Sequence, residues 1–384
     1  MNQINKGLGT GSGYLEKLDV LRGIAILSVV AYHFHGEWFY ERINKYDGWW
    51  LNTNGYTFAE VFRTFFPTSF GWAGVELFFV ISGFVIHYGY LQSGKERPNW
   101  IQFFNKRFWR IYPPYLFSMI FFALLMEKGT LTTKDFWSHV FMVHNFSTET
   151  FFGINASYWS LGVEMQFYLL YPLALYIRSR VGIKGLLAIG FVIHLGFGAI
   201  GLLMDWHSLP YDKNALKVWI LWLMGCAAAE FYLDGKRIFP NSPITFWTIF
   251  LLFFPLKAIW FSPYITDLYI SAVSAFGIEL YLNSEKKSLG FVERKLSEIG
   301  ICSYSMYLLH YLALITLTGR FQAFGLAKEY PWLRLIDGVI LFGAVFLLSR
   351  AYYDYVEIRS IEWGKAFYEK VLKKLMGRRE YAVR

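Results

Sequence analysis

The sequence predicts an all-α integral membrane protein, with about ten transmembrane helices around a central polar cavity. Three observations support this fold class. Hydrophobic residues make up 55% of the 384 residues and charged residues only 17%, against about 25% charged in average soluble domains. Long apolar stretches recur along the chain, and short basic runs separate them. A bilayer can cover that much apolar surface, whereas one soluble core of this size cannot.

Ten stretches reach or approach the roughly 20 apolar residues that a spanning helix needs. The predicted spans are residues 19–40, 72–91, 113–127, 158–177, 185–204, 215–232, 242–261, 264–282, 299–318 and 333–353. The segment 136–146 is apolar but short, so we expect it to be interfacial or re-entrant. Residues 1–17 are polar and Gly-rich, and the first apolar run lacks a small-residue cleavage site. That run is therefore expected to be a membrane helix rather than a cleaved signal.

Basic residues lie unevenly on the two sides of the predicted spans. Lys and Arg are dense in the loops around 95–110, 178–184, 236–237 and 286–295 and in the tail 350–384, and sparser in the alternate loops. The positive-inside rule then places both termini in the cytoplasm. This predicts a multi-pass protein of the cell inner membrane. The formal net charge of +9 is explained by these loops, so we expect no nucleic-acid partner.

The chain shows no internal repeat and no linker of low complexity. We expect a short cytoplasmic segment 1–18, one membrane domain 19–357 and a basic cytoplasmic tail 358–384. Cys226 and Cys302 lie in apolar stretches, without the spacing of a disulfide framework or a metal site. The loops 41–70 and 128–157 are rich in aromatic residues and Asn. That composition suits sugar stacking and a membrane-interface aromatic belt equally well.

Ionisable residues inside apolar spans are costly and mark candidate functional positions. In the first span, Arg22 lies near the cytoplasmic end and His33 follows eleven residues later. Eleven helical residues rise roughly 16 Å and return to within about 20° of the same face. The pair can anchor one elongated ligand. Alternatively, His33 bonds a neighbouring helix and Arg22 reaches lipid phosphate.

Three further positions have both a binding and a structural interpretation. Ser82, in the second span, is either a polar cavity group or part of a Ser-Gly helix-packing pair with Gly83. Arg107 and Arg110, in the segment after that span, are three residues apart and would share a face on a helix. They can hold an anionic phosphate group with Arg22, or serve only as positive-inside anchors.

The fourth predicted span contains Glu164, about 10 Å inside its outer boundary by helical rise. A carboxylate at that depth must be neutral or paired. His33 is expected at a comparable depth, and a carboxylate partner raises the basicity of an imidazole. In the ninth span, Ser303, Tyr307 and His310 follow i, i+4, i+7 spacing on one face. A shared internal cavity would explain why polar residues of four spans reach similar depth.

Five motifs in order resemble the membrane acyltransferase-3 family of integral O-acyltransferases. Arg22 and His33 resemble its Arg-x10-His signature, and residues 78–84 (FFVISGF) its second-helix motif. The others are Arg107-x-x-Arg110-x-Tyr112-Pro113, Trp159-Ser160-Leu161-x-x-Glu164 with Phe167-Tyr168, and Ser303-x-Ser305-x-Tyr307-x-x-His310. The resemblance covers Leu18 to Glu357. The Glu-x-Pro that often follows the last span is Glu357-Ile358-Arg359 here, which puts the geometry of the tail in doubt.

The resemblance implies transfer of an acyl group, acetyl by default, from cytoplasmic acyl-CoA to a hydroxyl of a surface or lipid-linked glycan. Arg22, Arg107 and Arg110 would hold the phosphates of acyl-CoA. His33 would act as general base or carry the acyl group, and Glu164 would orient it. The expected oxyanion donors and substrate contacts are Ser82, Tyr168, Ser303, Tyr307 and His310. No metal or permanently bound cofactor is required.

A transporter or flippase of a lipid-linked glycan is the alternative of another class. Such proteins also place ionisable residues near the middle of the membrane. They are expected to show repeat symmetry or broken helices in matching halves, and the sequence shows neither. A structural membrane subunit would give no reason for a polar cavity.

Overall fold

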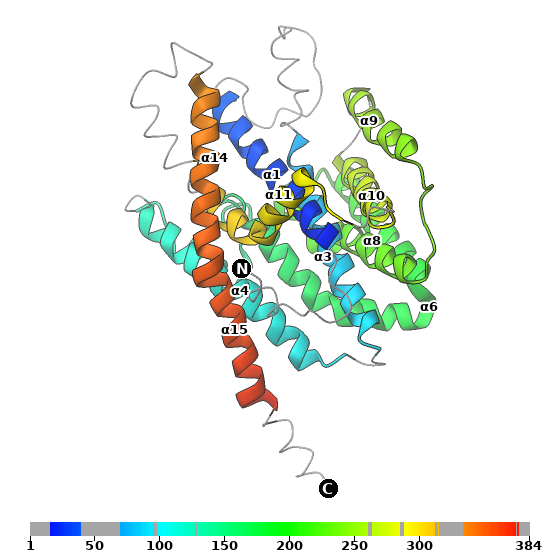
Figure 1. Ribbon diagram of the computed structural model, residues 1–384, viewed down its shortest axis with the longest axis horizontal. Coiled ribbons are helices and arrows are strands. Elements are labelled where there is room, and N and C mark those ends of the chain that lie inside the picture. Colours follow the sequence, from blue (N-terminus) through cyan, green and yellow to red (C-terminus); the bar gives the residue numbers. More distant parts are fainter. Residues whose placement is uncertain are drawn as a thin grey trace. The chain divides into compact units, whose positions relative to one another are not determined.

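The computed structural model confirms the all-α class (Figure 1). It describes residues 16–39, 70–94, 98–126, 129–206, 208–259, 263–284, 288–311, 314, 333–373 and 375. Within those ranges the chain forms helices and turns and no strand.

Six helices in the described ranges are long and apolar enough to cross a membrane. They comprise Ala73–Gln92, Trp100–Leu125, Trp159–Met204, Leu209–Leu233, Ile265–Leu282 and Val339–Leu372. These helices support a multi-pass membrane protein. The count of ten spans, the central cavity and the orientation of the termini stay predictions. Part of the expected span 299–318 lies outside the described residues.

The chain divides into two compact units that are interleaved in sequence. Unit 1 combines Met1–Gly94 with Leu169–Ser303, and unit 2 combines Lys95–Tyr168 with Tyr304–Arg384. Unit 1 contains α1 (Glu16–Phe39), α3 (Ala73–Gln92), most of α6 (Trp159–Met204), α7 (Leu209–Asp212), α8 (Ala215–Leu233), α9 (Pro243–Ile259), α10 (Pro263–Leu282) and α11 (Phe291–Ile301). Unit 2 contains α4 (Trp100–Leu125), α5 (Thr133–Val140), η3 (His144–Phe146), the start of α6, the helical residues 304–311, α14 (Leu333–Tyr352), η4 (Tyr353–Glu357), α15 (Ile358–Phe367) and η5 (Tyr368–Leu372).

The long α6 contains two of the predicted spans. Gly182 interrupts it with φ 72° and ψ 177°, a conformation that glycine adopts without a steric penalty. The expected break between residues 177 and 185 therefore falls at a real change of backbone direction.

Helix α4 starts earlier than predicted, and this is a correction. The residues around 95–110 were expected to form a loop before a span that begins at 113, whereas α4 runs from Trp100 through Pro113 and Pro114. A proline inside a helix leaves the carbonyl four residues earlier without its N–H donor. The carbonyl of Trp109 instead accepts a hydrogen bond from Ser360 Oγ. A distant side chain thus compensates for the break that the local sequence suggests.

The expected basic tail begins as a helix. α14, η4 and α15 follow one another without a gap and form one long rod in Figure 1. α15 packs on α4 within unit 2. Residues 376–384 lie outside the described part of the chain.

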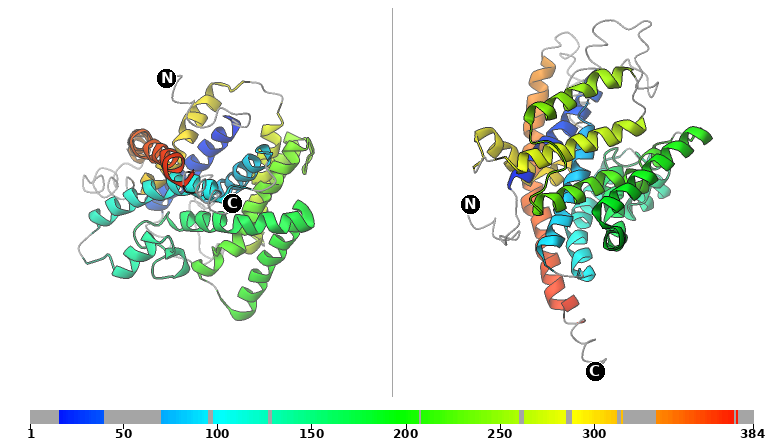
Figure 2. Two further views of the ribbon diagram at one scale, coloured as in Figure 1. Left: turned by 90° about the horizontal axis from the view of Figure 1, so that it is seen from below. Right: turned by 90° about the vertical axis from the view of Figure 1, so that its right-hand side faces the viewer.

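The core of unit 1 is built around α3, which packs against α1, α8 and α10 (Figure 2). α3 and α8 approach closely through two glycines. A Cβ added to Gly83 would lie 2.0 Å from the carbonyl oxygen of Trp222, and one added to Gly225 would lie 2.0 Å from that of Val80. Backbone contact of this kind is how small residues pack membrane helices.

We expect Gly83→Ala to destabilise the protein and Gly89→Ala not to. The first methyl group meets a backbone carbonyl, so the helices must separate, at a cost of roughly 1–3 kcal/mol. The methyl group of Gly89→Ala, on the same helix, meets nothing within 4 Å. That variant should gain up to about 1 kcal/mol of stability from the higher helix propensity of alanine. Thermal unfolding of the purified proteins in one detergent checks this. Equal midpoints for the two variants would contradict the close contact.

Candidate functional site

Glu164 lies in unit 2 beside a tyrosine whose ring lies close to an arginine. It is half-buried on the first turns of α6 and accepts a hydrogen bond from the hydroxyl of Tyr168, one turn later. The guanidinium of Arg107 lies 5.6 Å from the centre of the Tyr168 ring and 5.7 Å from that of Phe103. A cation over an aromatic face is attracted by the ring. Three predicted site residues of α4 and α6 thus form one cluster.

A second carboxylate belongs to the same unit. Glu357 is 3% exposed and ends the π-helical turn η4, a distortion that is frequent at functional sites. It accepts a hydrogen bond of 2.6 Å from Ser305 Oγ. Next to Ser305 in the chain, the half-buried Tyr304 donates from its hydroxyl to the carbonyl of Ile111 at 2.8 Å.

Sequence reasoning did not select Glu357, Ser305 or Tyr304 as site residues. Glu357 is an acidic residue four positions after the predicted span 333–353, and Ser305 is one helical turn after Ile301. The rule that picked Glu164, an ionisable group inside an apolar helix, would also have found Glu357 if the last span had been extended by one turn.

Tyr307 joins a chain of hydroxyl groups. Its hydroxyl lies 2.6 Å from Ser160 Oγ and donates to the carbonyl of Ser157 at 2.7 Å. Ser157 Oγ in turn donates to Asn155 Oδ1 at 2.7 Å. This chain connects the helix 304–311 to the start of α6.

His310 is fully buried, and its tautomer follows from its contacts. Its Nδ1 lies 2.8 Å from the carbonyl oxygen of Tyr307. A carbonyl only accepts, so Nδ1 carries the proton and Nε2 of the neutral ring carries the lone pair. Ser303 is buried at 5% exposure and is counted with unit 1.

His33 has the same tautomer in unit 1. Its Nδ1 donates to the carbonyl oxygen of Val29 at 2.9 Å, one turn back on α1. Nε2 of the half-buried ring therefore holds the lone pair that a general base needs. The expected contact between His33 and Glu164 joins residues of the two units and stays a prediction.

The remaining predicted residues have distinct surroundings. Arg22 forms an ion pair of 3.1 Å with Asp19 on its own helix. Arg110 is half-buried on α4, three residues after Arg107. Ser82 Oγ accepts a hydrogen bond of 3.4 Å from Trp222 Nε1, beside the Gly83 contact, which supports the packing interpretation. A role for these three in substrate binding stays a prediction.

Unit 1 also buries charged networks that sequence reasoning did not predict. His87 bonds Tyr171 through Nδ1 at 3.0 Å and Glu230 through Nε2 at 2.9 Å, and Arg178 pairs with Glu230. Lys213 pairs with Glu76 at 3.3 Å and with Asp267 at 3.2 Å. Opposite charges meet within each network, which offsets part of the cost of their burial. In the second network one lysine faces two carboxylates, and Glu76 Oε2 has no hydrogen-bond partner among the described residues. Both networks are consistent with a structural role.

Two stacked histidines lie in the segment predicted to be interfacial or re-entrant. The rings of His139 on α5 and His144 on η3 are parallel within 8°, with centroids 4.0 Å apart, and both residues are fully buried. Burial lowers the pKa of His144 from 6.5 to about 3, and the neighbouring His139 contributes in the same direction. Burial also lowers the pKa of His139. Both rings are therefore neutral at pH 7.

This pair predicts acid sensitivity of the 129–158 segment. A histidine whose pKa is lowered by folding binds a proton more strongly in the unfolded state. The free energy of unfolding of this segment is therefore highest above about pH 6.5 and decreases as the pH drops toward 3. His144 alone should contribute a slope of about 1.4 kcal/mol per pH unit in that window. Hydrogen exchange of this segment at pH 7, 6 and 5 measures it. A His144→Phe variant should lose that part of the slope, and an unchanged slope would contradict the assignment.

A metal centre needs several His, Cys, Asp or Glu side chains close together. Within the described ranges, no group of three His, Cys, Asp or Glu side chains is placed to hold a metal ion. Fold and site thus define a helical membrane protein that carries carboxylate, hydroxyl and neutral imidazole groups within its helices.

The chain belongs to the acyltransferase domain family, whose sequence profile matches residues 15–353. That range includes every predicted site residue. The expected family membership is therefore confirmed. No solved structure matches the chain.

Several relatives are O-acetyltransferases of bacteria. The chain is 26% identical to the peptidoglycan O-acetyltransferase OatA of Listeria monocytogenes, over 93% of this chain and 58% of that protein. It is 25% identical to the O-acetyltransferase OatA of Staphylococcus aureus, over 78% of this chain and 50% of that protein. A third relative, at 26% identity over 44% of this chain and 25% of its own length, is the putative peptidoglycan O-acetyltransferase YrhL of Bacillus subtilis. The chain thus spans about half the length of the first two of these relatives.

Proposed function

We propose that this protein is an O-acyltransferase of the cell envelope. It transfers an acyl group, acetyl by default, from cytoplasmic acyl-CoA to a hydroxyl of a glycan. The observation that carries the proposal is the family match over residues 15–353. The names of the relatives support acetyl as the group and peptidoglycan as the first acceptor to test.

The proposed chemistry uses the His33 ring on α1, whose Nδ1 carries a proton and whose Nε2 holds a lone pair. The acceptor hydroxyl loses its proton to His33 Nε2 while its oxygen attacks the thioester carbonyl. The carbon–sulfur bond then breaks, and the proton passes from the imidazolium to the departing thiolate. The tautomer fixed by the Val29 carbonyl supports this order, because it leaves the lone pair on Nε2.

Glu164 and the groups around it have supporting roles in this proposal. A carboxylate stabilises the imidazolium that forms when His33 takes the proton. Tyr168 bonds Glu164, and Glu357 holds Ser305 in the same unit. A buried hydroxyl such as that of Tyr307 can donate to a developing oxyanion when it exchanges its bond to the Ser157 carbonyl for one to the oxyanion. Arg22, Arg107 and Arg110 would hold the phosphates of the donor.

Purified protein with labelled acetyl-CoA and peptidoglycan fragments tests the function. We expect CoA release that depends on the acceptor, and an ester on the glycan that mass spectrometry detects and mild alkali removes. A second set of fragments with blocked hydroxyls is the control. Movement of a lipid-linked glycan between leaflets without CoA release would instead support the transporter alternative.

A further inference from the structure

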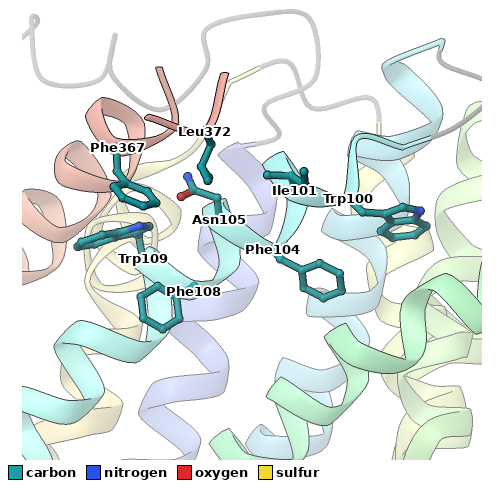
Figure 3. Close-up of a pocket in the computed structure, with 8 residues that line it drawn as sticks. All are labelled: Trp100, Ile101, Phe104, Asn105, Phe108, Trp109, Phe367 and Leu372. Atoms are coloured by element: carbon teal, nitrogen blue, oxygen red, sulfur yellow. The ribbon is translucent and has the colours of Figure 1, made fainter. Parts of the chain in front are cut away.

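A groove of about 480 Å³ runs between the first half of α4 and the C-terminal helices of unit 2 (Figure 3). Its α4 residues recur every three to four positions and so form one stripe of the helix. The lining consists of Trp100, Ile101, Phe104, Asn105, Phe108 and Trp109 from α4, with Phe367 of α15 and Leu372 of η5.

The two walls of the groove are fixed to each other. Asn105 Nδ2 donates to the carbonyl of Gly364 at 2.9 Å, and Asn99 Nδ2 donates to the hydroxyl of Tyr368 at 3.1 Å. Gly364 permits the close approach, because a Cβ there would lie 2.5 Å from Cβ of Trp109. The groove is therefore preformed, which lowers the entropy cost of filling it.

The lining suits a hydrocarbon chain. Seven of its eight side chains are apolar, and the amide nitrogen of the eighth, Asn105, already donates to Gly364. Ile101 and Phe367 remain 46% and 41% exposed. The volume falls in the range of about 300–1,000 Å³ typical of ligand pockets. A sugar or nucleotide would find few polar partners inside.

The surroundings of the groove are positively charged. Residues 98–126 contain three basic residues and no acidic one, and residues 358–375 contain five basic and two acidic residues. Lys106 and Lys370 are exposed and neighbour lining residues in the chain. Basic side chains beside an apolar surface attract lipids with anionic headgroups.

We propose that this groove binds one acyl chain of an anionic phospholipid, with Lys106 and Lys370 contacting its phosphate. The acyl chain of such a lipid matches the apolar lining, and its phosphate matches the positive rim, by which we mean Lys106 and Lys370. The inference is independent of the proposed acyl transfer, because it concerns binding alone.

Tryptophan quenching by brominated lipids tests the proposal. The full protein is placed in nanodiscs of phosphatidylcholine that contain a small fraction of brominated phosphatidylglycerol or brominated phosphatidylcholine. We expect stronger quenching by the anionic lipid, and we expect the difference to disappear in the Trp100→Phe/Trp109→Phe variant. A matched Trp137→Phe/Trp206→Phe variant, which removes two exposed tryptophans elsewhere, should keep it.

The rim is tested separately. Lys106→Ala/Lys370→Ala should lower the preference for phosphatidylglycerol about thirtyfold, because each lysine near an anionic surface contributes on the order of fivefold. Lys184→Ala/Lys236→Ala, at exposed positions in unit 1, is the control. Equal quenching of the wild-type protein by both brominated lipids, or an unchanged preference in the rim variant, would overturn the proposal.

Discussion

Replacing His33 by alanine is expected to lower acyl transfer about 10²- to 10⁴-fold, the contribution typical of a general base. The physical reason is that the lone pair of this ring is on Nε2. Because Nδ1 donates its proton to the Val29 carbonyl, only Nε2 can take a proton from the acceptor. The measurement is the initial rate of acceptor-dependent CoA release at saturating acetyl-CoA.

Ser28→Ala is the matched control for His33. Ser28 lies on the same helix and donates only to the carbonyl of Ile24, one turn back, at 2.9 Å. Its loss should leave the transfer rate within about twofold of the wild type. The lost hydrogen bond contributes only roughly 0.5–1.5 kcal/mol to stability, and the proposed chemistry does not use Ser28. Membrane abundance of both variants should match the wild type. Full activity of His33→Ala would remove the general base from the mechanism.

Replacing Glu164 by glutamine should lower the same rate about 10- to 150-fold, since a hydrogen bond to a charged group contributes roughly 1.5–3 kcal/mol. Glutamine keeps an oxygen that can accept from the Tyr168 hydroxyl, so the local packing persists and only the negative charge is lost. The rate constant, rather than the Michaelis constant, should carry most of the change.

Tyr168→Phe separates charge from packing at this position. It removes the hydroxyl that bonds Glu164 but leaves the carboxylate and the ring beneath Arg107. We expect a smaller loss, of about tenfold, corresponding to the lower end, roughly 1.5 kcal/mol, of the range for a hydrogen bond to a charged group. If Tyr168→Phe were severely impaired and Glu164→Gln active, the essential group would be the phenol and not the carboxylate.

The helices were predictable because the bilayer imposes a minimum apolar length on each of them. The break in α6 was predictable too, since a glycine lies between two apolar runs. The start of α4 was not, because two adjacent prolines indicate a helix boundary locally. Ser360, which donates a hydrogen bond to the carbonyl of Trp109 in place of the missing proline N–H, lies far away in the chain.

The candidate site was predictable only in its residue types. Depth along a helix follows from the rise per residue, so Glu164 and His33 stood out. The partners of a side chain depend on which helices meet, and no periodicity contains that information. The bonds from Tyr304 to Ile111 and from Ser305 to Glu357 became visible only when helices from the middle and end of the chain were seen together.

The interleaving of the two units has a consequence for biosynthesis. Unit 2 is completed only after residues 169–303 have been made, which at about 5–20 residues per second takes the ribosome roughly 7–27 seconds. Throughout that delay the early helices expose Ser160 and Trp109 before Tyr307 and Ser360 exist to bond them. A nascent chain that stops short of Ser360 would therefore leave the Trp109 carbonyl without its side-chain donor.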